Sequence, residues 1–247
     1  GEVIDAVALN SATGVDITTT SDVGTYADEI AITGQSGSNG FSAGNYDLSY
    51  VTGDLVVNQR AVTLTASQQE RAYGDTMVLD ETAFTITDLD GDSALPNGEL
   101  IDTVSLNSAT GVDISATSNA GTYADEIVIT GQAGSNGFDA DNYDLSYVTG
   151  DLVVSPRALM LIASQQVRIY GDTMVLDDTA FAVADLDGDI LSALPNGEEI
   201  DTVVLNSVTG VDITTTSNVG AYADEIEITG QAGSNGFSAG NYDLSYV

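Results

Sequence analysis

The sequence predicts an all-β protein made of tandem, small β-sandwich-like modules arranged as an extended rod. Three observations predict this fold class: near-identical internal repeats, apolar residues that alternate with polar ones, and glycine-containing turns without a convincing helical period. A β-grasp-like module is the alternative, because each half of a repeat is only about 50 residues long. One helical turn is the most that we expect, within residues 74–84.

The repeats are visible by eye. GEVIDAVALNSATGVDI begins at Gly1, GELIDTVSLNSATGVDI at Gly98 and GEEIDTVVLNSVTGVDI at Gly197, so the spacings are 97 and 99 residues. The two extra residues in the second spacing are Ile190 and Leu191. A period of about 100 residues is too long for one coil of a solenoid and suits a series of small domains.

The repeat pattern sets the predicted domain boundaries. Residues 1–57 form the C-terminal part of a repeat, residues 58–154 form a complete repeat, and residues 155–247 form a repeat that lacks its last strand. The stretch from Tyr46 to Ala66 is almost unbroken strand pattern, with turn residues at 52–53 and polar residues at 58–59. We therefore expect the last strand of one domain to be joined by a very short link to the first strand of the next.

Differences between the copies predict which strand positions face a core. Ile127 and Ile129 are isoleucine in all three copies, whereas Val128 corresponds to Ala31 and Glu227. A position that accepts glutamate faces water, and its two neighbours then face the interior, which is the period of a β-strand. We predict that Ile127 and Ile129 are buried and that Val128 is exposed.

Two further segments show the same alternation. In YDLSYV it predicts that Tyr143, Leu145 and Tyr147 are buried, and in AVTLTA it predicts that Val62 and Leu64 are buried. Turns are expected at Asp90-Gly91, at Pro96-Asn97-Gly98 and within GQSGSNG, residues 34–40. Seven or eight short strands per repeat would then fit a small sandwich.

Charge and composition exclude several classes of function. The chain has 38 acidic residues and four arginines, a net charge of −34, and no lysine, histidine or cysteine. This charge opposes binding to nucleic acid phosphates and to anionic lipid, and no apolar run is long enough for membrane insertion. Because disulfides and lysine crosslinks are impossible, bracing by a metal ion becomes the more interesting option.

The sequence resembles a known family. Residues 61–154 resemble the MBG-type repeats (mostly beta, glycine-rich, with a YG signature) of large bacterial surface adhesins. The matching pieces are AVTLTASQQERAYGD (61–75), FTITDLDGD (84–92), NAGTYADEI (119–127) and NYDLSYVTGDLVV (142–154). The next copy repeats the first three pieces as ALMLIASQQVRIYGD, FAVADLDGD and NVGAYADEI, where GAYA at 220–223 in place of GTYA is a mild departure. The resemblance implies an extracellular, bacterial cell-surface location and no enzymatic activity.

An acidic loop is the best candidate for a metal site. DLDGDSALPNGE runs from Asp88 to Glu99, with acids at positions 1, 3, 5 and 12, which is the spacing of an EF-hand calcium loop. Gly91 at position 4, Pro96 at position 9 and the lack of flanking helices depart from that motif. The candidate calcium ligands here are Asp88, Asp90, Asp92 and Glu99.

The Asp-x-Asp-Gly-Asp core of this loop occurs twice. Asp185, Asp187 and Asp189 repeat it, but the inserted Ile190 and Leu191 shift the later acid to Glu198. A solvated acidic turn is the alternative for both loops. Asp139, Asp141 and Asp144 form another acidic group, but the other copies lack two of the three acids, which indicates surface variation.

These observations leave two functional hypotheses. The first is a structural spacer, not an enzyme, that holds an adhesive tip away from a bacterium and whose partners are the neighbouring repeats of the same chain. The second is a repeated ligand-binding module for a glycan or another fibre, in which a row of tyrosines such as Tyr26, Tyr46 and Tyr50 could bind sugars. Ca²⁺ is the expected cofactor in the first case.

Overall fold

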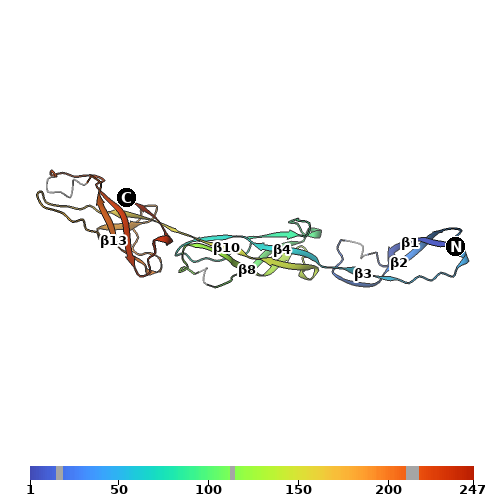
Figure 1. The fold of residues 1–247 in the computed structure, drawn as a ribbon. Helices are drawn as coiled ribbons and strands as arrows, with labels where there is room; N and C mark the ends of the chain where they lie inside the picture. The colour runs from blue at the N-terminus through green and yellow to red at the C-terminus, as the bar shows by residue number, and fades with distance from the viewer. Residues whose placement is uncertain (15–18, 112–114, 210–216) are drawn as a thin grey trace. The chain divides into compact units, whose positions relative to one another are not determined.

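The structure, a computed structural model, describes residues 1–14, 19–111, 115–209 and 217–247. The described residues form β-strands joined by turns, and their helical elements are 3-10 turns of three residues (Figure 1). None of these helical elements is long and apolar enough to cross a membrane. The prediction of an all-β fold is confirmed.

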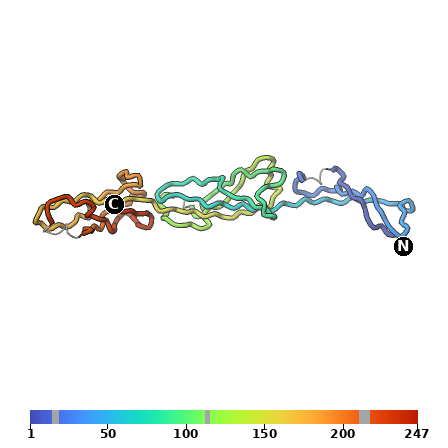
Figure 2. Tube along the Cα trace, turned by 90° about the horizontal axis from the view of Figure 1, so that it is seen from above, coloured from blue at the N-terminus to red at the C-terminus, as the bar shows by residue number. Residues whose placement is uncertain are grey.

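The described part of residues 1–57 contains one antiparallel sheet in the order β1-β2-β3. Its strands are β1 (Val3–Ser11), β2 (Gly24–Ser38) and β3 (Gly53–Val57), with the 3-10 turn η1 (Ala43–Asn45) between the last two. The strands β1 and β2, which pair with each other, lie in the blue part of the trace near the N-terminus (Figure 2). β3 is an edge strand, because it pairs with β2 alone in this sheet.

Seven strands are described between Arg60 and Ser155, which matches the predicted number, and they form two sheets. One sheet has the order β6-β4-β9, and its middle strand β4 runs parallel to β9. The other has the order β5-β10-β8-β7, and β5 runs parallel to β10. The bounds are β4 (Arg60–Ala66), β5 (Gln69–Ala72), β6 (Phe84–Asp88), η2 (Pro96–Gly98), β7 (Leu100–Ser108), β8 (Gly121–Ser135), η3 (Ala140–Asn142), β9 (Tyr143–Val148) and β10 (Gly150–Ser155).

The described part of residues 155–247 repeats this plan with fewer strands. One sheet has the order β12-β11-β15, and β13 pairs with β14 in another. The bounds are β11 (Arg157–Ala163), β12 (Phe181–Ala184), η4 (Pro195–Gly197), β13 (Glu199–Ser207), β14 (Ile226–Ser234), η5 (Ala239–Asn241) and β15 (Tyr242–Tyr246). Residues 166–169, which match β5 in sequence, are outside the strands.

The links between consecutive copies are very short, as predicted. Residues 58–59 alone separate β3 from β4, and Pro156 alone separates β10 from β11. Within the middle copy, Thr149 separates β9 from β10. The nearly unbroken strand pattern therefore breaks at a turn residue and again at the link between copies.

Contacts divide the chain into two compact units that do not coincide with the sequence repeats. Unit 1 contains residues 1–66, 81–105 and 129–148, and unit 2 contains residues 67–80, 106–128 and 149–247. Each unit thus combines parts of two consecutive copies. The domain boundaries drawn from the repeat pattern stay a prediction.

The core follows the predicted alternation in its central strands. Val62, Leu64, Ile127 and Ile129 are buried, and Tyr143 joins them. Leu145 and Val128 are half-buried rather than fully buried and fully exposed. Alternation therefore predicted the buried positions Ile127 and Ile129 correctly, but not the degree of burial of Leu145 and Val128.

Tyr147 corrects the prediction for the third position of YDLSYV. Its side chain is 43% exposed, and its hydroxyl donates a hydrogen bond of 2.6 Å to Oε1 of Gln132. The matching tyrosines, Tyr50 and Tyr246, bond to the matching glutamines. A tyrosine whose hydroxyl has a hydrogen-bond acceptor nearby can remain partly exposed at the rim of a sheet.

Two local predictions are wrong. Residues 74–84 contain turns but no helical turn. The segment GQSGSNG (residues 34–40) is mostly strand rather than turn. β2 continues to Ser38, and only Asn39 and Gly40 form the turn. Both glycine and serine in this segment were compatible with a turn, but the long β1–β2 pairing extends through them.

Candidate functional site

The most completely buried aromatic side chain of unit 2 comes from the YG sequence. Tyr73, immediately after β5, is 2% exposed, and its backbone N–H donates to the carbonyl of Ser155, 2.9 Å away. Its hydroxyl donates to Oε1 of Glu198 over 2.6 Å. Its ring packs edge-on against the ring of Tyr242, with 5.5 Å between centroids. Tyr73 thus connects the middle copy to residues of the last copy.

Glu198 holds two tyrosine hydroxyls at once. It is 5% exposed and accepts hydrogen bonds from Tyr73 and Tyr242 through different carboxylate oxygens. Asn196 adds a hydrogen bond of 3.2 Å from its side-chain amide to the Tyr73 hydroxyl. Burial, followed by the hydrogen bond to Glu198, raises the pKa of Tyr242 and of Tyr73 above the ordinary tyrosine value.

The residues next to Tyr73 are also fixed by the last copy. Gly74 has φ of +84°, and a Cβ there would lie 2.4 Å from the Cβ of Pro195, so this position requires glycine. Arg157 donates from Nε to the carbonyl of Tyr73 over 2.8 Å and forms an ion pair with Asp75. We call Tyr73, Gly74 and Asp75 the wedge. We call the residues that receive it the socket: Arg157, Pro195, Asn196, Glu198 and Tyr242.

An apolar cluster surrounds the wedge. Tyr73 packs with Val154, Leu159, Leu194 and Tyr242, all of which are at most 9% exposed. Burial of apolar surface contributes about 25 cal/mol per Å², so the packing of these side chains stabilises the fold. The Tyr-Gly-Asp sequence therefore works as an anchor that is both apolar and hydrogen-bonded.

A second contact between copies is an asparagine clasp in unit 2. Asn241, which is 3% exposed, accepts from the backbone N–H of Ala120 over 2.9 Å. Its amide also donates to Oδ1 of Asn119 over 3.1 Å. Asn196 donates to the carbonyl of Ala116 over 3.0 Å. Two asparagines of the last copy thus hold the loop of the middle copy.

The same clasp recurs in unit 1 with the matching residues. Asn142 accepts from the backbone N–H of Val23 over 2.8 Å and donates to Oδ1 of Asp22 over 3.0 Å. Asn97 donates to the carbonyl of Thr19 over 2.9 Å. Both clasps therefore use the same positions of consecutive copies, which makes them a property of the repeat.

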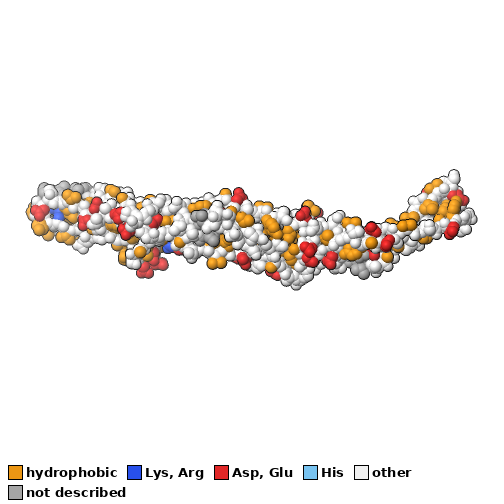
Figure 3. Space-filling view, turned by 90° about the horizontal axis from the view of Figure 1, so that it is seen from below, with side chains coloured by type: hydrophobic (Ala, Val, Ile, Leu, Met, Phe, Trp, Pro, Cys, Tyr) orange, Lys and Arg blue, Asp and Glu red, His pale blue; other side chains and the backbone are white. Residues whose placement is uncertain are grey.

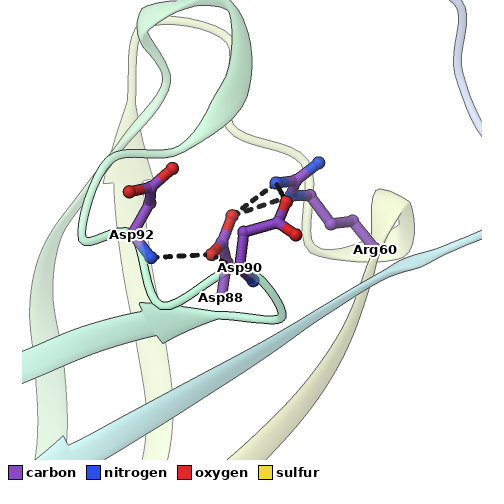
Figure 4. Close-up of polar contacts among 4 residues, drawn as sticks. All are labelled: Arg60, Asp88, Asp90 and Asp92. Carbon is purple, nitrogen blue, oxygen red and sulfur yellow. Dashed lines mark hydrogen bonds and ion pairs between the residues drawn. The ribbon is translucent and has the colours of Figure 1, made fainter.

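The first predicted calcium loop is a compact acidic turn joined to an arginine (Figure 4). Oδ1 of Asp88 accepts from the backbone N–H groups of Asp90 and Asp92, each at 2.9 Å. Oδ2 forms an ion pair with Arg60, which also reaches Asp90 over 3.2 Å. The hydrogen bond from Arg60, followed by that from the Asp92 backbone, lowers the pKa of Asp88 below its usual range.

The second predicted loop has the same backbone turn without the arginine. Oδ1 of Asp185 accepts from the backbone N–H groups of Asp187 and Asp189, at 3.0 and 2.9 Å. The ion pairs found among the described residues involve Arg60 and Arg157. Arg157, the counterpart of Arg60, pairs with Asp75 rather than with Asp185. The matching arginines of two copies therefore have different partners.

The predicted acids do not gather into one cluster. Glu99 accepts a hydrogen bond of 2.7 Å from the hydroxyl of Tyr143, and Glu198 belongs to the socket. Among the described residues, no group of three or more acidic side chains is placed to hold a metal ion. Acidic side chains lie in small groups on the face in Figure 3, where basic side chains are rare. Calcium binding stays a prediction.

A buried glutamate recurs in each copy and was not singled out from the sequence. Glu126 is 3% exposed and accepts hydrogen bonds from the side chain of Ser108 and from the backbone N–H and hydroxyl of Thr110. Glu29 and Glu225 are also buried and make the matching contacts. In the middle copy, this carboxylate on β8 accepts from several donors and so holds Ser108 and Thr110 at the end of β7.

The wedge and the socket were missed for a physical reason. Their residues come together from positions far apart in the sequence, so no local pattern relates Tyr73 to Glu198. The available signals were the recurrence of YGD and of LPNGE in successive copies. A recurring glycine after a tyrosine indicates a backbone position that needs positive φ or a close approach.

With this geometry established, comparison with known proteins gives one match. Residues 62–153 match the family model described as MBG domain (YGX type). The resemblance predicted from the sequence is therefore confirmed for this segment, and it indicates a repeat domain of surface proteins. No curated protein matches the chain. No solved structure matches it either.

Proposed function

We propose that the chain is a structural spacer of a long bacterial cell-surface or biofilm adhesin, which acts outside the cell and holds an adhesive tip away from it. Its partners are the neighbouring repeats of the same chain, and the modules follow one another as an extended rod. The role requires no catalysis, so we propose that the protein is not an enzyme.

The contact between the wedge and the socket is the observation that carries this proposal. Tyr73 of one copy is buried by Glu198, Tyr242 and Leu194 of the next, and Arg157 fixes the backbone beside it. A link of one residue, Pro156, leaves little freedom between the strands on either side. Short links and buried contacts restrict bending, which is what a spacer needs.

Calcium is the proposed stabilising ion of this spacer. The acidic turns at Asp88 and Asp185 repeat with the period of the protein, and the net charge of −34 favours cations around the chain. Asp185 fits a cation better than Asp88 does, because the Oδ2 oxygen of Asp88 already pairs with Arg60. We therefore assign the stronger site to Asp185, Asp187 and Asp189.

The alternative function, repeated binding of a glycan or of another fibre, has weaker support. It needs exposed tyrosines with available hydroxyls. The hydroxyls of Tyr50, Tyr147 and Tyr246 donate to glutamine side chains, and that of Tyr26 donates to the carbonyl of Asp22. A sugar would have to replace these hydrogen bonds.

Small-angle X-ray scattering of the whole 247-residue chain tests the spacer role. A spacer gives the distance distribution of an elongated particle, and Tyr73→Ala broadens that distribution because the copies then bend more freely. Tyr222→Ala is the control, because its side chain is 47% exposed and lies outside the wedge and the socket. A compact, spherical profile for the unmodified chain contradicts the spacer.

Two further measurements separate the alternatives. Antibodies raised against the chain should label intact cells of the bacterium that produces it, and labelling that appears only after lysis contradicts the proposed location. A glycan array probed with the chain should show no binding above background. Selective binding to one glycan class, lost when the tyrosines are replaced by phenylalanine, would favour the alternative function instead.

A further inference from the structure

The two strands that begin the middle copy run parallel to the two strands that end it. β4 pairs with β9, and Thr63 lies opposite Ser146, with 2.8 Å between their hydroxyl oxygens. β5 pairs with β10, and Gln69 lies opposite Leu152. The paired residues are 83 apart in sequence in both pairs, so the register of the first pair is kept in the second.

The same pairing recurs in the last copy. β11 and β15, which match β4 and β9 in sequence, also run parallel, and Arg157 lies opposite Tyr242. The other strand pairs with a described register are antiparallel. Parallel pairing therefore belongs to the strands at the beginning and at the end of a copy.

Parallel pairing determines how tension along the chain acts on these strands. The chain enters the middle copy through residues 58–59, just before β4, and leaves it through Pro156, just after β10. The start of one strand and the end of its parallel partner lie at opposite ends of the pair. Tension therefore pulls the two strands past each other and loads their hydrogen bonds together. If the strands were antiparallel, the same tension would open the bonds one after another from one end.

The strands of these pairs are also anchored in the core. Their inward side chains are at most 1% exposed: Val62 and Leu64 in β4, and Leu152 and Val154 in β10. Water has little access to strands that are packed in this way, and a hydrogen bond that breaks without a replacement partner costs more than one exchanged with water. The buried packing thus raises the barrier to sliding one strand along the other.

The end of the second pair is fixed by the wedge. The backbone N–H of Tyr73 donates to the carbonyl of Ser155 over 2.9 Å, which continues the contact between β5 and β10 by one residue. Tyr73 is buried in the socket, and Arg157, directly after the link, donates to its carbonyl over 2.8 Å. The pair is therefore closed at the point where the chain leaves the copy.

We propose that the protein resists mechanical tension and that the parallel pairs β4–β9, β5–β10 and β11–β15 are its clamps. A clamp is here a strand pair whose hydrogen bonds must break together. The force that unfolds a copy then depends on the direction of pulling. Forced unfolding is governed by the barrier to unfolding and not by equilibrium stability, so the two quantities can respond differently to a substitution.

Single-molecule force spectroscopy in two pulling geometries tests the proposal. The chain has no cysteine, so a pair of introduced cysteines fixes the points of attachment. Asn58→Cys with Pro156→Cys pulls the start of β4 against the end of β10 and loads the clamps in shear. Asn58→Cys with Asp141→Cys separates β4 and β9 from the end at which both begin, so their ladder opens bond by bond. All three residues are exposed.

We expect the first geometry to require a force several times higher than the second. The gain in length, about 3.5 Å for each residue released, identifies the part of the chain that has unfolded. Circular dichroism and melting curves establish that both cysteine variants are folded. Equal unfolding forces in the two geometries would overturn the proposal.

A matched pair of core variants gives a second readout in the first geometry. Leu64→Ala shortens a side chain of a clamp strand, whereas Ile129→Ala shortens one in β8, outside the parallel pairs, and both side chains are at most 4% exposed. Both should lower the melting temperature. Leu64→Ala should also lower the unfolding force markedly, whereas Ile129→Ala should change it little. If Leu64→Ala does not fold, Leu64→Val makes the same comparison with a smaller loss of packing.

An equal loss of force in the β4 and β8 variants would also contradict the clamps, because the force would then follow overall stability. Neither of the contradicting results bears on the spacer role, which scattering tests through the shape of the chain. Conversely, a compact chain that still unfolds at different forces in the two geometries would retain the clamps and lose the spacer.

Discussion

Tyr73 and Glu198 are 125 residues apart in the sequence, yet the tyrosine hydroxyl donates a hydrogen bond of 2.6 Å to the carboxylate, and both side chains are buried. The pair joins two consecutive copies of the repeat. It also gives a physical role to the tyrosine of the YG sequence, because Tyr73 lies where the middle copy meets the last copy.

Truncation of Tyr73 should destabilise unit 2 strongly. Tyr73→Ala removes a buried ring and leaves Glu198 with one hydroxyl donor fewer, so we expect a loss of about 3–5 kcal/mol in the free energy of unfolding. Tyr73→Phe keeps the ring and should cost about 1.5–3 kcal/mol, the usual worth of a hydrogen bond to a charged group. Urea unfolding of both variants measures the difference. Tyr170→Ala, at the matching but exposed position of the last copy, should change the stability by less than about 0.5 kcal/mol.

Gly74 and Gly171 form a matched pair for testing the close approach of the wedge. Both have positive φ, +84° and +89°, so alanine introduces similar backbone strain of about 1–2 kcal/mol at each. At Gly74 the new Cβ would also lie 2.4 Å from Pro195, whereas at Gly171 no atom lies within 4 Å. Gly74→Ala should therefore cost about 1–3 kcal/mol more than Gly171→Ala. Equal melting temperatures for the two variants would contradict the contact with Pro195.

Ile129 and Val128 test the inward and outward faces of β8. Ile129 is 4% exposed, so Ile129→Ala should cost about 2–5 kcal/mol. Val128→Glu should change stability little, because the matching residue of the last copy is already Glu227, which is exposed. Thermal unfolding of the two variants checks this prediction. A larger loss for Val128→Glu than for Ile129→Ala would place the core on the other face.

The buried tyrosines predict a loss of stability at alkaline pH. Burial, and then the hydrogen bond to Glu198, raises the pKa of Tyr242 above the unfolded value of about 10. A group whose folded pKa is raised contributes stability that is complete below its unfolded pKa and is lost as the pH rises through its folded pKa. Melting temperatures measured from about pH 9 to about pH 12 should therefore fall, and Tyr242→Phe should flatten this part of the curve. Tyr222→Phe, at an exposed site, should leave the slope unchanged.

Calcium should raise the melting temperature if the acidic turns bind it. A ligand at a hundredfold excess over its Kd adds about 2.7 kcal/mol, and weak extracellular sites have Kd values of roughly 10⁻⁴–10⁻³ M. We expect Asp185→Asn to reduce calcium binding more than Asp88→Asn does, because Arg60 competes at Asp88. Isothermal titration calorimetry and melting curves measure these effects. Sodium chloride of matched ionic strength is the control, and equal stabilisation by both salts would identify the loops as acidic turns only.

The sequence predicted the fold correctly where the alternation of apolar and polar residues determines it, as at Ile127 and Ile129. It misplaced Tyr147, because the pattern shows which face a side chain is on but not how far along a strand the core extends. Residues 74–84 looked compatible with a helical turn, yet the wedge at their start is fixed by distant residues. The socket could not be predicted in the same way, since its residues meet only in the folded chain.

The wedge at Tyr73 is followed, one repeat later, by the socket that fits it, and the clasp asparagines recur in the same phase. The DNA that encodes such near-identical copies is a substrate for unequal crossing-over. Because a crossover at matching positions removes or adds one whole period, it rejoins a wedge to a compatible socket. The gene can therefore lengthen or shorten in steps of one repeat without any compensating mutation, so that selection can adjust the reach of the protein directly.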